Sequence, residues 1–203
     1  QNDGTVNLGI VDIDGKNFKK LTFFEQGEQL FNPKFSADDS QILFDFSIKD
    51  NRDVARINAD GSGYELLTTS EADERNPFMA KDGLLYYSSD ETGIFNIYSL
   101  DLKTKVKKQL TNVVGGAYMP AVNDKNDIAY AGYTASGFKI FVNGKEEQAK
   151  VDPTKKYVSL NNPPLEENKP NGDIGKFDIV KLKNYDDTKI PEYTPEKYSG
   201  FFS

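Results

Sequence analysis

Apolar residues along this chain occur in short runs of strand length, separated by turns rich in Asp, Gly and Ser. The runs are rich in Ile, Leu, Phe, Tyr and Val, the residue types that favour β-strands. Three of them are apolar at consecutive positions: residues 42–48 (ILFDFSI), 84–89 (LLYYSS) and 128–133 (IAYAGY). A strand that is apolar on both faces has to be covered on both, so the pattern predicts sheets packed face to face.

These runs belong to a unit that repeats along the chain. Pro33, Pro77 and Pro120 each stand shortly before an apolar run, at intervals of 44 and 43 residues. A Leu-Thr pair, first found at Leu21, recurs after 46 and then after 43 residues. Two independent markers with nearly the same period indicate a true structural repeat.

Each repeat unit divides into the same series of segments. A segment that begins at Pro is followed by an Asp-rich turn, the apolar run, a polar loop and a third segment, and in two units a fourth segment ends on Leu-Thr. Pro33 and Pro77 are expected to start strands, where a missing N–H costs least. Asp38 and Asp39 are expected to form turns, and Asp-Gly pairs suit tight hairpins. Four strands repeating at this period are typical of a β-propeller blade.

The residues that carry this pattern also indicate a family. The stretch NPKFSADDSQILFDF, continued by DVARINADGSGYELLT, resembles the TolB-like (WD-like) β-propeller repeat, in which Pro-x-aromatic-Ser-Pro-Asp-Gly precedes an apolar strand, a second Asp-Gly and Leu-Thr. The resemblance covers roughly residues 6–145. Ala37 and Ala80 replace the Pro inside the turn, and the third unit lacks a closing Leu-Thr. The resemblance implies an all-β fold, a β-propeller of about three to four blades of four antiparallel strands each.

The repeat also predicts how the chain is organised. Residues 150–203 change character: they hold a Pro-rich, Asn-rich loop, two strand-like segments and a Pro/Tyr-rich end. Their strands could complete the first blade and close a small ring, or the chain could be a fragment of a larger propeller; we expect the fragment. The predicted parts are TolB-like blades over 1–149 (a partial blade 1–22 and blades 32–68, 76–111 and 120–149), then blade-closing strands and an extended tail or linker over 150–203.

Composition narrows the function. The chain carries 25 Lys and Arg against 32 Asp and Glu, a net charge of −7, and an acidic surface repels nucleic acid. It has no Cys and no His, which excludes thiol nucleophiles, the Ser-His-Asp triad and nearly all zinc or iron sites. No apolar stretch approaches the ~20 residues that span a bilayer. We expect no cofactor.

Carboxylate, Lys or Tyr chemistry is what remains for catalysis, and carboxylates are what remains for metal binding. Paired carboxylates could cleave glycosides, but acidic side chains in turns of an acidic protein are usually only solvated. The spacing of an EF-hand fails around both Gly15 and Gly61. We therefore expect neither catalysis nor a metal site within this chain. The acidic residues considered were Asp38, Asp39, Asp45, Asp73, Glu74 and Asp90.

Aromatic and loop residues have different expected roles. Six aromatic residues in strand-like segments are expected to pack between blades: Phe35, Phe44, Phe46, Tyr86, Tyr98 and Tyr130. In a propeller, the loops between blades and the loops between second and third strands gather at one end, where binding groups concentrate. Those loops are 69–76, 112–119, 49–52, 90–93 and 134–137. The binding candidates in or beside them are Arg52, Asp73, Glu74, Arg75, Glu91 and Tyr118, with Asp90 alongside.

These observations favour a non-catalytic binding or scaffold module. By resemblance to TolB-like propellers, it would mediate protein–protein interactions in a bacterial cell envelope, in the periplasm. One alternative is an accessory propeller of a multidomain, peptidase-like enzyme whose catalytic domain lies outside this chain. Another is a carbohydrate-binding propeller. The expected partner is a protein, and no segment of this chain is expected to span a membrane. The sequence does not fix the oligomeric state.

Overall fold

The computed structural model describes residues 4–48 and 51–152, and the account below concerns these. The chain divides into two compact units, Gln1–Ser159 and Leu160–Ser203. The second unit lies outside the described residues, and so do the strands and the tail predicted over 153–203. Strands make up nearly all the regular structure of the described residues, as predicted, and these residues include one short helix, α1 (Lys145–Ala149).

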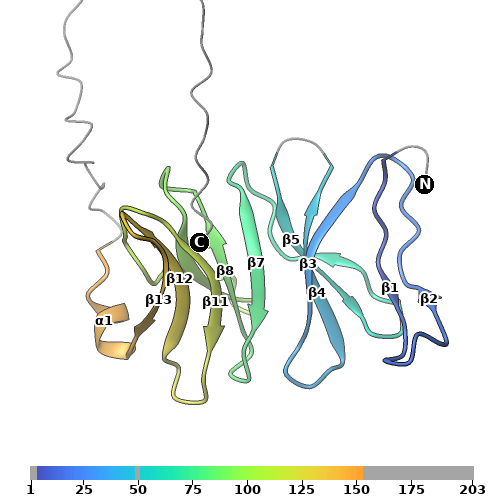
Figure 1. The fold of residues 1–203 in the computed structure, drawn as a ribbon. Coiled ribbons are helices and arrows are strands. Elements are labelled where there is room, and N and C mark those ends of the chain that lie inside the picture. The colour runs from blue at the N-terminus through green and yellow to red at the C-terminus, as the bar shows by residue number, and fades with distance from the viewer. Residues whose placement is uncertain (1–3, 49–50, 153–203) are drawn as a thin grey trace, which may run out of the picture. The chain divides into compact units, whose positions relative to one another are not determined.

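The strands form separate antiparallel sheets whose members are consecutive in sequence (Figure 1). A two-stranded sheet pairs β1 (Gly9–Ile10) with β2 (Lys19–Lys20). Blade A contains β3 (Gln29–Phe35), β4 (Gln41–Ser47), β5 (Asp53–Asn58) and β6 (Glu65–Leu66); blade B contains β7 (Glu74–Met79), β8 (Leu84–Ser89), β9 (Asn96–Asp101) and β10 (Lys107–Gln109). Blade C has three strands: β11 (Ala117–Val122), β12 (Ile128–Thr134) and β13 (Gly137–Asn143).

The two-faced apolar strands are covered on both sides, as the sequence predicts. In β4, Phe44 packs with Leu8 and Leu21 of the preceding sheet, whereas Leu43 packs with Leu85 and Tyr87 of blade B. A third cluster joins blade B to blade C in the same way. Of the aromatic residues expected in the core, Phe44, Phe46, Tyr86, Tyr98 and Tyr130 are buried, but Phe35 is 50% exposed because it lies at the turn-side end of β3.

The Leu-Thr pairs have a role that the sequence did not reveal. In each sheet that has the pair, the threonine hydroxyl accepts a hydrogen bond of 2.8 Å from a backbone N–H at or directly before the start of a strand: Thr22 from Leu8, Thr68 from Val54 and Thr111 from Ile97. Each threonine is buried, and each hydroxyl donates to an Asx side chain fifteen residues earlier. These Asx residues are Asn7, Asp53 and Asn96. Each side chain also accepts a hydrogen bond from the backbone N–H two residues after its threonine.

The prolines lie within strands, so their predicted place at strand starts is wrong. The first strand of each blade begins three or four residues before its proline, and its pairing register shifts there, as in a β-bulge. The residue before each proline has a left-handed backbone, with φ of 51° at Asn32, 56° at Asn76 and 55° at Met119. A bulge interrupts the ladder, so proline's missing N–H leaves no partner unsatisfied.

A buried aspartate connects blade A to the bulge of blade B. Asp45 of β4 is 0% exposed, and its carboxylate accepts the backbone N–H of Asn76 at 2.7 Å and the amide of Asn32 at 2.7 Å. Burial raises the pKa of Asp45, while those hydrogen bonds and Arg52 oppose the rise. One carboxylate therefore fixes two bulges. Asp38 and Asp39 form the turn predicted for them: Asp38 accepts from Ser36 and Ser40 side chains, and Asp39 has φ of 58°.

The loop from blade A to blade B is held by two more carboxylates. Glu74, 2% exposed, accepts the Ser70 hydroxyl at 3.1 Å through Oε1, while its Oε2 has no hydrogen-bond partner among the described residues. Its backbone N–H donates to the Arg52 carbonyl at 2.7 Å. Burial raises the pKa of Glu74, and nearby Asp53 adds to the rise; burial also raises the pKa of Asp53.

Replacing Thr111 with valine should lower the free energy of unfolding by about 1–3 kcal/mol, because the Ile97 N–H and the Asn96 side chain both lose a buried partner. Thr111→Ser keeps the hydroxyl and is the matched control, which should lose clearly less. Urea unfolding measures both variants. A Thr111→Val protein as stable as the parent would show that the hydrogen bonds of this hydroxyl do not contribute.

Met119→Asn should raise the free energy of unfolding by up to about 1 kcal/mol, because asparagine tolerates the left-handed backbone far better than methionine does. Met119 is 58% exposed, so little packing is lost. Met119→Ala removes the same side chain without suiting the backbone and should not stabilise. A thermal melt of the three proteins decides; stabilisation by alanine as large as that by asparagine would contradict the bulge argument.

Stability should also depend on pH through Glu74. A raised carboxyl pKa means that the folded state binds the proton more tightly than the unfolded state, so this stabilisation is present below the unfolded pKa of about 4.3 and is lost as pH rises through the folded value. Glu74→Gln should therefore unfold at higher urea concentration than the parent at neutral pH, with the gap narrowing toward about pH 4. Exposed Glu71→Gln is the control, and a Glu74→Gln protein destabilised at neutral pH would refute the assignment.

Candidate functional site

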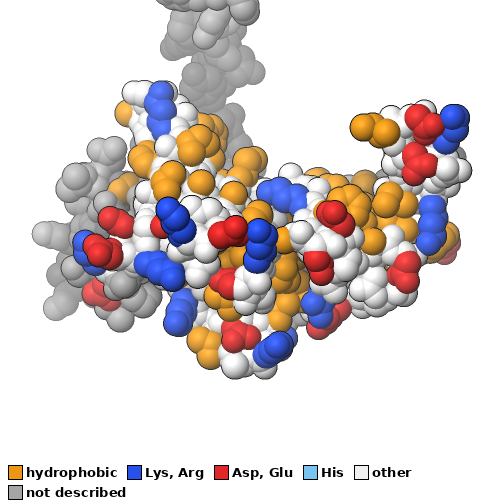
Figure 2. Space-filling model, turned by 90° about the horizontal axis from the view of Figure 1, so that it is seen from below, with side chains coloured by type: hydrophobic (Ala, Val, Ile, Leu, Met, Phe, Trp, Pro, Cys, Tyr) orange, Lys and Arg blue, Asp and Glu red, His pale blue; other side chains and the backbone are white. Residues whose placement is uncertain are grey.

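Two classes of loops gather at one end of the blades, which we call the loop end. The loops from second to third strand and the loops between blades lie at the top in Figure 1, whereas the turns from first to second strand lie at the bottom. Figure 2 views the bottom, where Lys and Arg side chains are interspersed with Asp and Glu side chains. The predicted binding residues belong to the loops and strand ends of the loop end.

Blades A and B each have one arginine and one phenylalanine at two equivalent positions, and the two residue types are exchanged between these positions. The guanidinium of Arg52 lies 3.8 Å from the centre of the Phe31 ring. In blade B, Arg75 takes the place of Phe31, two residues before the proline, and its guanidinium lies 5.0 Å from the Phe95 ring. Arg52 and Phe95 each directly precede the Asx residue that accepts the threonine hydroxyl. The two cation–π pairs are thus one structural feature with its members exchanged.

Blade C continues this feature with two aromatic rings. Tyr118, two residues before its proline, meets Phe138 at 6.1 Å and Phe95 of blade B at 5.1 Å between ring centres. Tyr133 meets the other side of Phe138 at 5.0 Å. The rings therefore link blades B and C at the loop end. We call this set the aromatic–arginine row: Phe31, Arg52, Arg75, Phe95, Tyr118 and Phe138.

The arginines of the row are already paired with carboxylates of the chain. Arg52 lies 3.5 Å from the Asp45 carboxylate. Arg75 donates through Nε to Asp73 at 2.9 Å and through a second nitrogen to the other oxygen, and this pairing raises the pKa of Arg75. The Asp73 N–H in turn donates to Asp90 at 2.8 Å. Asp73 therefore occupies the donor side of the Arg75 guanidinium, whereas Arg52 has one ion pair, and each guanidinium has a phenylalanine ring over one face.

The surface beside the aromatic–arginine row is acidic. A hollow of about 450 Å³ is lined by Asn51, Ser70, Glu71, Asp73 and Asp90. With the arginines paired, the loop end combines planar apolar surfaces with exposed carboxylates. This combination suits contact with aromatic, apolar or cationic groups of a partner.

The predicted site residues divide into three groups. Arg52, Arg75, Asp73 and Tyr118 come together at the loop end, although Arg75 and Tyr118 lie at the start of strands β7 and β11 and not in loops. Glu74 is buried and cannot be presented to a ligand. Glu91 pairs with Lys107 of β10 instead of with the row. Sequence reasoning missed Phe31, Phe95 and Phe138, which could have been found by their spacing from the prolines and the Asx residues.

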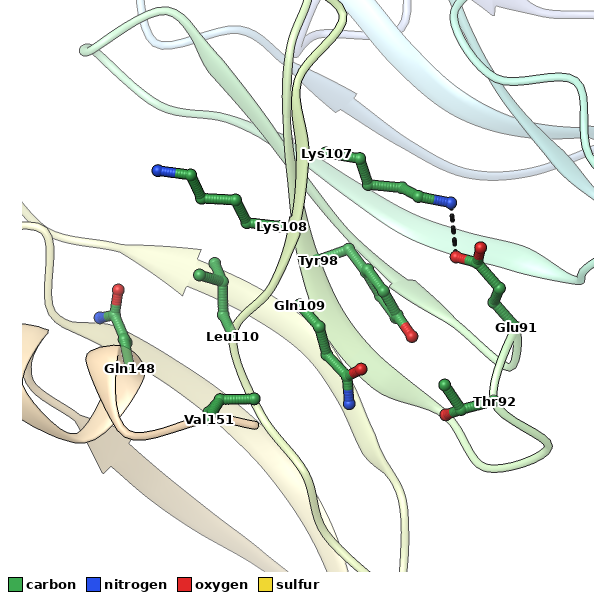
Figure 3. Close-up of a pocket in the computed structure, with 9 residues that line it drawn as sticks. All are labelled: Glu91, Thr92, Tyr98, Lys107, Lys108, Gln109, Leu110, Gln148 and Val151. Carbon is green, nitrogen blue, oxygen red and sulfur yellow. Dashed lines mark hydrogen bonds and ion pairs between the residues drawn. The ribbon is translucent and has the colours of Figure 1, made fainter. Parts of the chain in front are cut away.

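A separate groove lies beside β10, the outer strand of blade B (Figure 3). Its volume is about 670 Å³, and its residues come from β9, β10, the 90–95 loop and the segment around α1. Tyr98, 4% exposed, directs its hydroxyl toward Thr92 and Glu91. Burial raises the pKa of Tyr98 and nearby Thr92 opposes the rise, but the Tyr98 hydroxyl completes no hydrogen bond within the described residues.

Metal and membrane features were also sought in residues 4–48 and 51–152. Within these ranges, no group of three or more acidic side chains is placed to hold a metal ion. No helix there has the length and apolar character needed to cross a membrane.

Comparison with known proteins identifies the fold. No family model matches the sequence, and no curated protein matches it. TolB from Acinetobacter baumannii is similar in structure, with a TM-score of 0.56 and 18% identity over 69% of this chain and 35% of that one. A protein assigned as TolB from Agrobacterium tumefaciens has the same TM-score and identity over 68% of this chain and 52% of that one. A puromycin-hydrolyzing peptidase from Mycobacterium tuberculosis has a TM-score of 0.54 and 16% identity over 67% of this chain and 23% of that one.

These likenesses agree with the fold expected from the repeat. The chain spans about a third to a half of the two TolB structures and under a quarter of the peptidase. At such low identity the likeness concerns the fold alone. The described part of the chain has the TolB-like β-propeller fold that the sequence predicted.

Proposed function

We propose that this chain is a non-catalytic binding module whose loop end docks a protein partner. The observation that carries the proposal is the aromatic–arginine row, which presents planar side chains from three consecutive blades at one end. Aromatic and arginine side chains supply most of the energy at protein interfaces, above all when a rigid scaffold holds them. Phe138 is 63% exposed and Tyr133 is 55% exposed, so the blade C end of the row is open to a partner.

The non-catalytic part of the proposal rests on the roles of the ionisable groups. Without His or Cys, catalysis would depend on carboxylate, Lys or Tyr side chains, and the carboxylates at the loop end already have structural roles. Asp45 is committed to two bulges, Asp73 to Arg75, and Glu74 is buried against Ser70. A cell-envelope location belongs to the same proposal and is supported by resemblance to TolB-like propellers.

An accessory role in a larger enzyme is the second candidate. The likeness to the puromycin-hydrolyzing peptidase covers only 23% of that chain. A propeller of this kind can therefore be part of a much longer peptidase chain. A parent gene encoding a Gly-x-Ser-x-Gly elbow and a downstream His beyond these residues would favour this role over a free-standing binding module.

A photo-crosslinking amino acid placed at Phe138 tests the loop-end proposal. In cells of the source organism it should give a discrete crosslinked protein, because the row lies in the interface. The same probe at Phe35, an exposed aromatic position at the opposite end of β3, should not give that product.

The second arm of this test removes a hot spot. Tyr118→Ala should reduce the Phe138 crosslink by about tenfold or more, provided that the variant melts like the parent. A crosslink unchanged by Tyr118→Ala, or equal at Phe35 and Phe138, would refute docking at the row. A product identified as glycan would support carbohydrate binding in its place.

A further inference from the structure

The outer strand of blade B presents an unpaired edge to the groove of Figure 3. β10 pairs with β9 through Lys107, Lys108 and Gln109, opposite Leu100, Ser99 and Tyr98. The Val106 carbonyl accepts the Asp101 N–H, and the Leu110 N–H donates to the Ile97 carbonyl. Antiparallel ladders alternate, so the N–H and C=O groups of Lys107 and Gln109 point away from β9. In the part of the chain that the structure describes, no strand pairs with them.

The groove lies on both sides of this edge. Successive strand residues point to opposite faces. On one face, Lys107 and Gln109 lie with Tyr98, whose ring centre is 5.8 Å from the Lys107 ammonium. On the other face, Lys108 and Leu110 lie toward Gln148 and Val151 of the α1 segment (Figure 3). An added strand would therefore place alternate side chains in two differently lined halves of the groove.

One buried group in the groove has no partner of its own. The Tyr98 hydroxyl is removed from solvent without a hydrogen bond inside the described residues. Leaving such a group unpaired costs about 1–3 kcal/mol. Because this oxygen is closed to solvent, a ligand in the groove meets the ring of Tyr98 and not its hydroxyl, and the charge of the edge is the feature that selects the ligand.

The edge also has the opposite charge to the rest of the protein. Four of the six residues in 103–108 are lysines, in a chain of net charge −7. Lys107 is paired with Glu91 at 2.5 Å. Lys108 is exposed, and no carboxylate of the described residues forms an ion pair with it. The ligand that matches this edge therefore carries carboxylates.

We propose that β10 accepts an extended acidic peptide as a fifth strand of blade B. The peptide backbone pairs with the outward groups of Lys107 and Gln109. Its acidic side chains reach Lys108 on one face of the edge, and its apolar side chains lie against the ring of Tyr98 on the other. This surface is distinct from the aromatic–arginine row, so the proposal does not depend on docking at the loop end.

A short acetylated peptide of alternating Glu and Val residues, carrying a fluorophore, is the probe. Fluorescence anisotropy with the full chain should show saturable binding, and the equivalent Lys-Val peptide should bind at least about tenfold more weakly. Lys108→Glu should weaken binding of the Glu-Val peptide by a similar factor without lowering the melting temperature.

Backbone pairing is tested by a matched pair of variants at one residue. Gln109→Pro removes an outward N–H that β9 does not use, and it should weaken binding by about tenfold; Gln109→Ala keeps the N–H and should bind like the parent. If Gln109→Pro fails to fold, a Glu-Val peptide N-methylated at alternate residues removes the same pairing from the other side. Equal binding of the methylated and unmethylated peptides would overturn strand addition.

Hydrogen exchange on the full chain completes the test. The amides of Lys107 and Gln109 should exchange rapidly in the free protein and slowly with the Glu-Val peptide. Protection already present in the free chain would mean that another segment of the protein occupies the edge, and would overturn the proposal. Absence of anisotropy change up to about 1 mM peptide would overturn it as well.

Discussion

A buried threonine hydroxyl, present after the last strand of three of the described sheets, fixes the path of the chain from one sheet to the next. In blade B, the Thr111 hydroxyl accepts the Ile97 N–H and donates to Asn96, which also accepts the N–H of Val113. One buried hydroxyl group therefore fixes the third strand, the fourth strand and the start of the next loop. The same geometry at Thr22 and Thr68 makes successive loops leave their blades in the same way.

The aromatic–arginine row follows from this regularity. The bulge at each proline fixes one position on the first strand, and the Asx residue bound to threonine fixes another at the start of the third strand. Side chains two residues before proline and one residue before Asx must then meet across the sheet. The scaffold requires only that their flat faces fit, because Phe31 and Arg52 in blade A are exchanged for Arg75 and Phe95 in blade B. Chemistry at the loop end can thus vary while the backbone stays constant.

The sequence allowed the fold to be predicted but not the geometry of the site. Apolar residues at consecutive positions of β4 and β8 imply sheets on both sides, and the clusters around Leu43 and Phe44 confirm this. The bulge was missed because proline more often marks a strand end than an interruption inside a strand. The burial of Glu74 could not be predicted because its partner Ser70 lies in an inter-blade loop whose path depends on the packing of two blades.

The lysines of β10 illustrate how one feature can serve both solubility and recognition. Charged residues on an edge strand discourage pairing between copies of a protein, because like charges would face one another across the new ladder. Two β10 edges brought together would oppose Lys107 and Lys108 of one copy with lysines of the other. An acidic strand meets no such repulsion and gains ion pairs with the same side chains. The charge that protects this edge from self-association therefore selects the kind of strand that can join it.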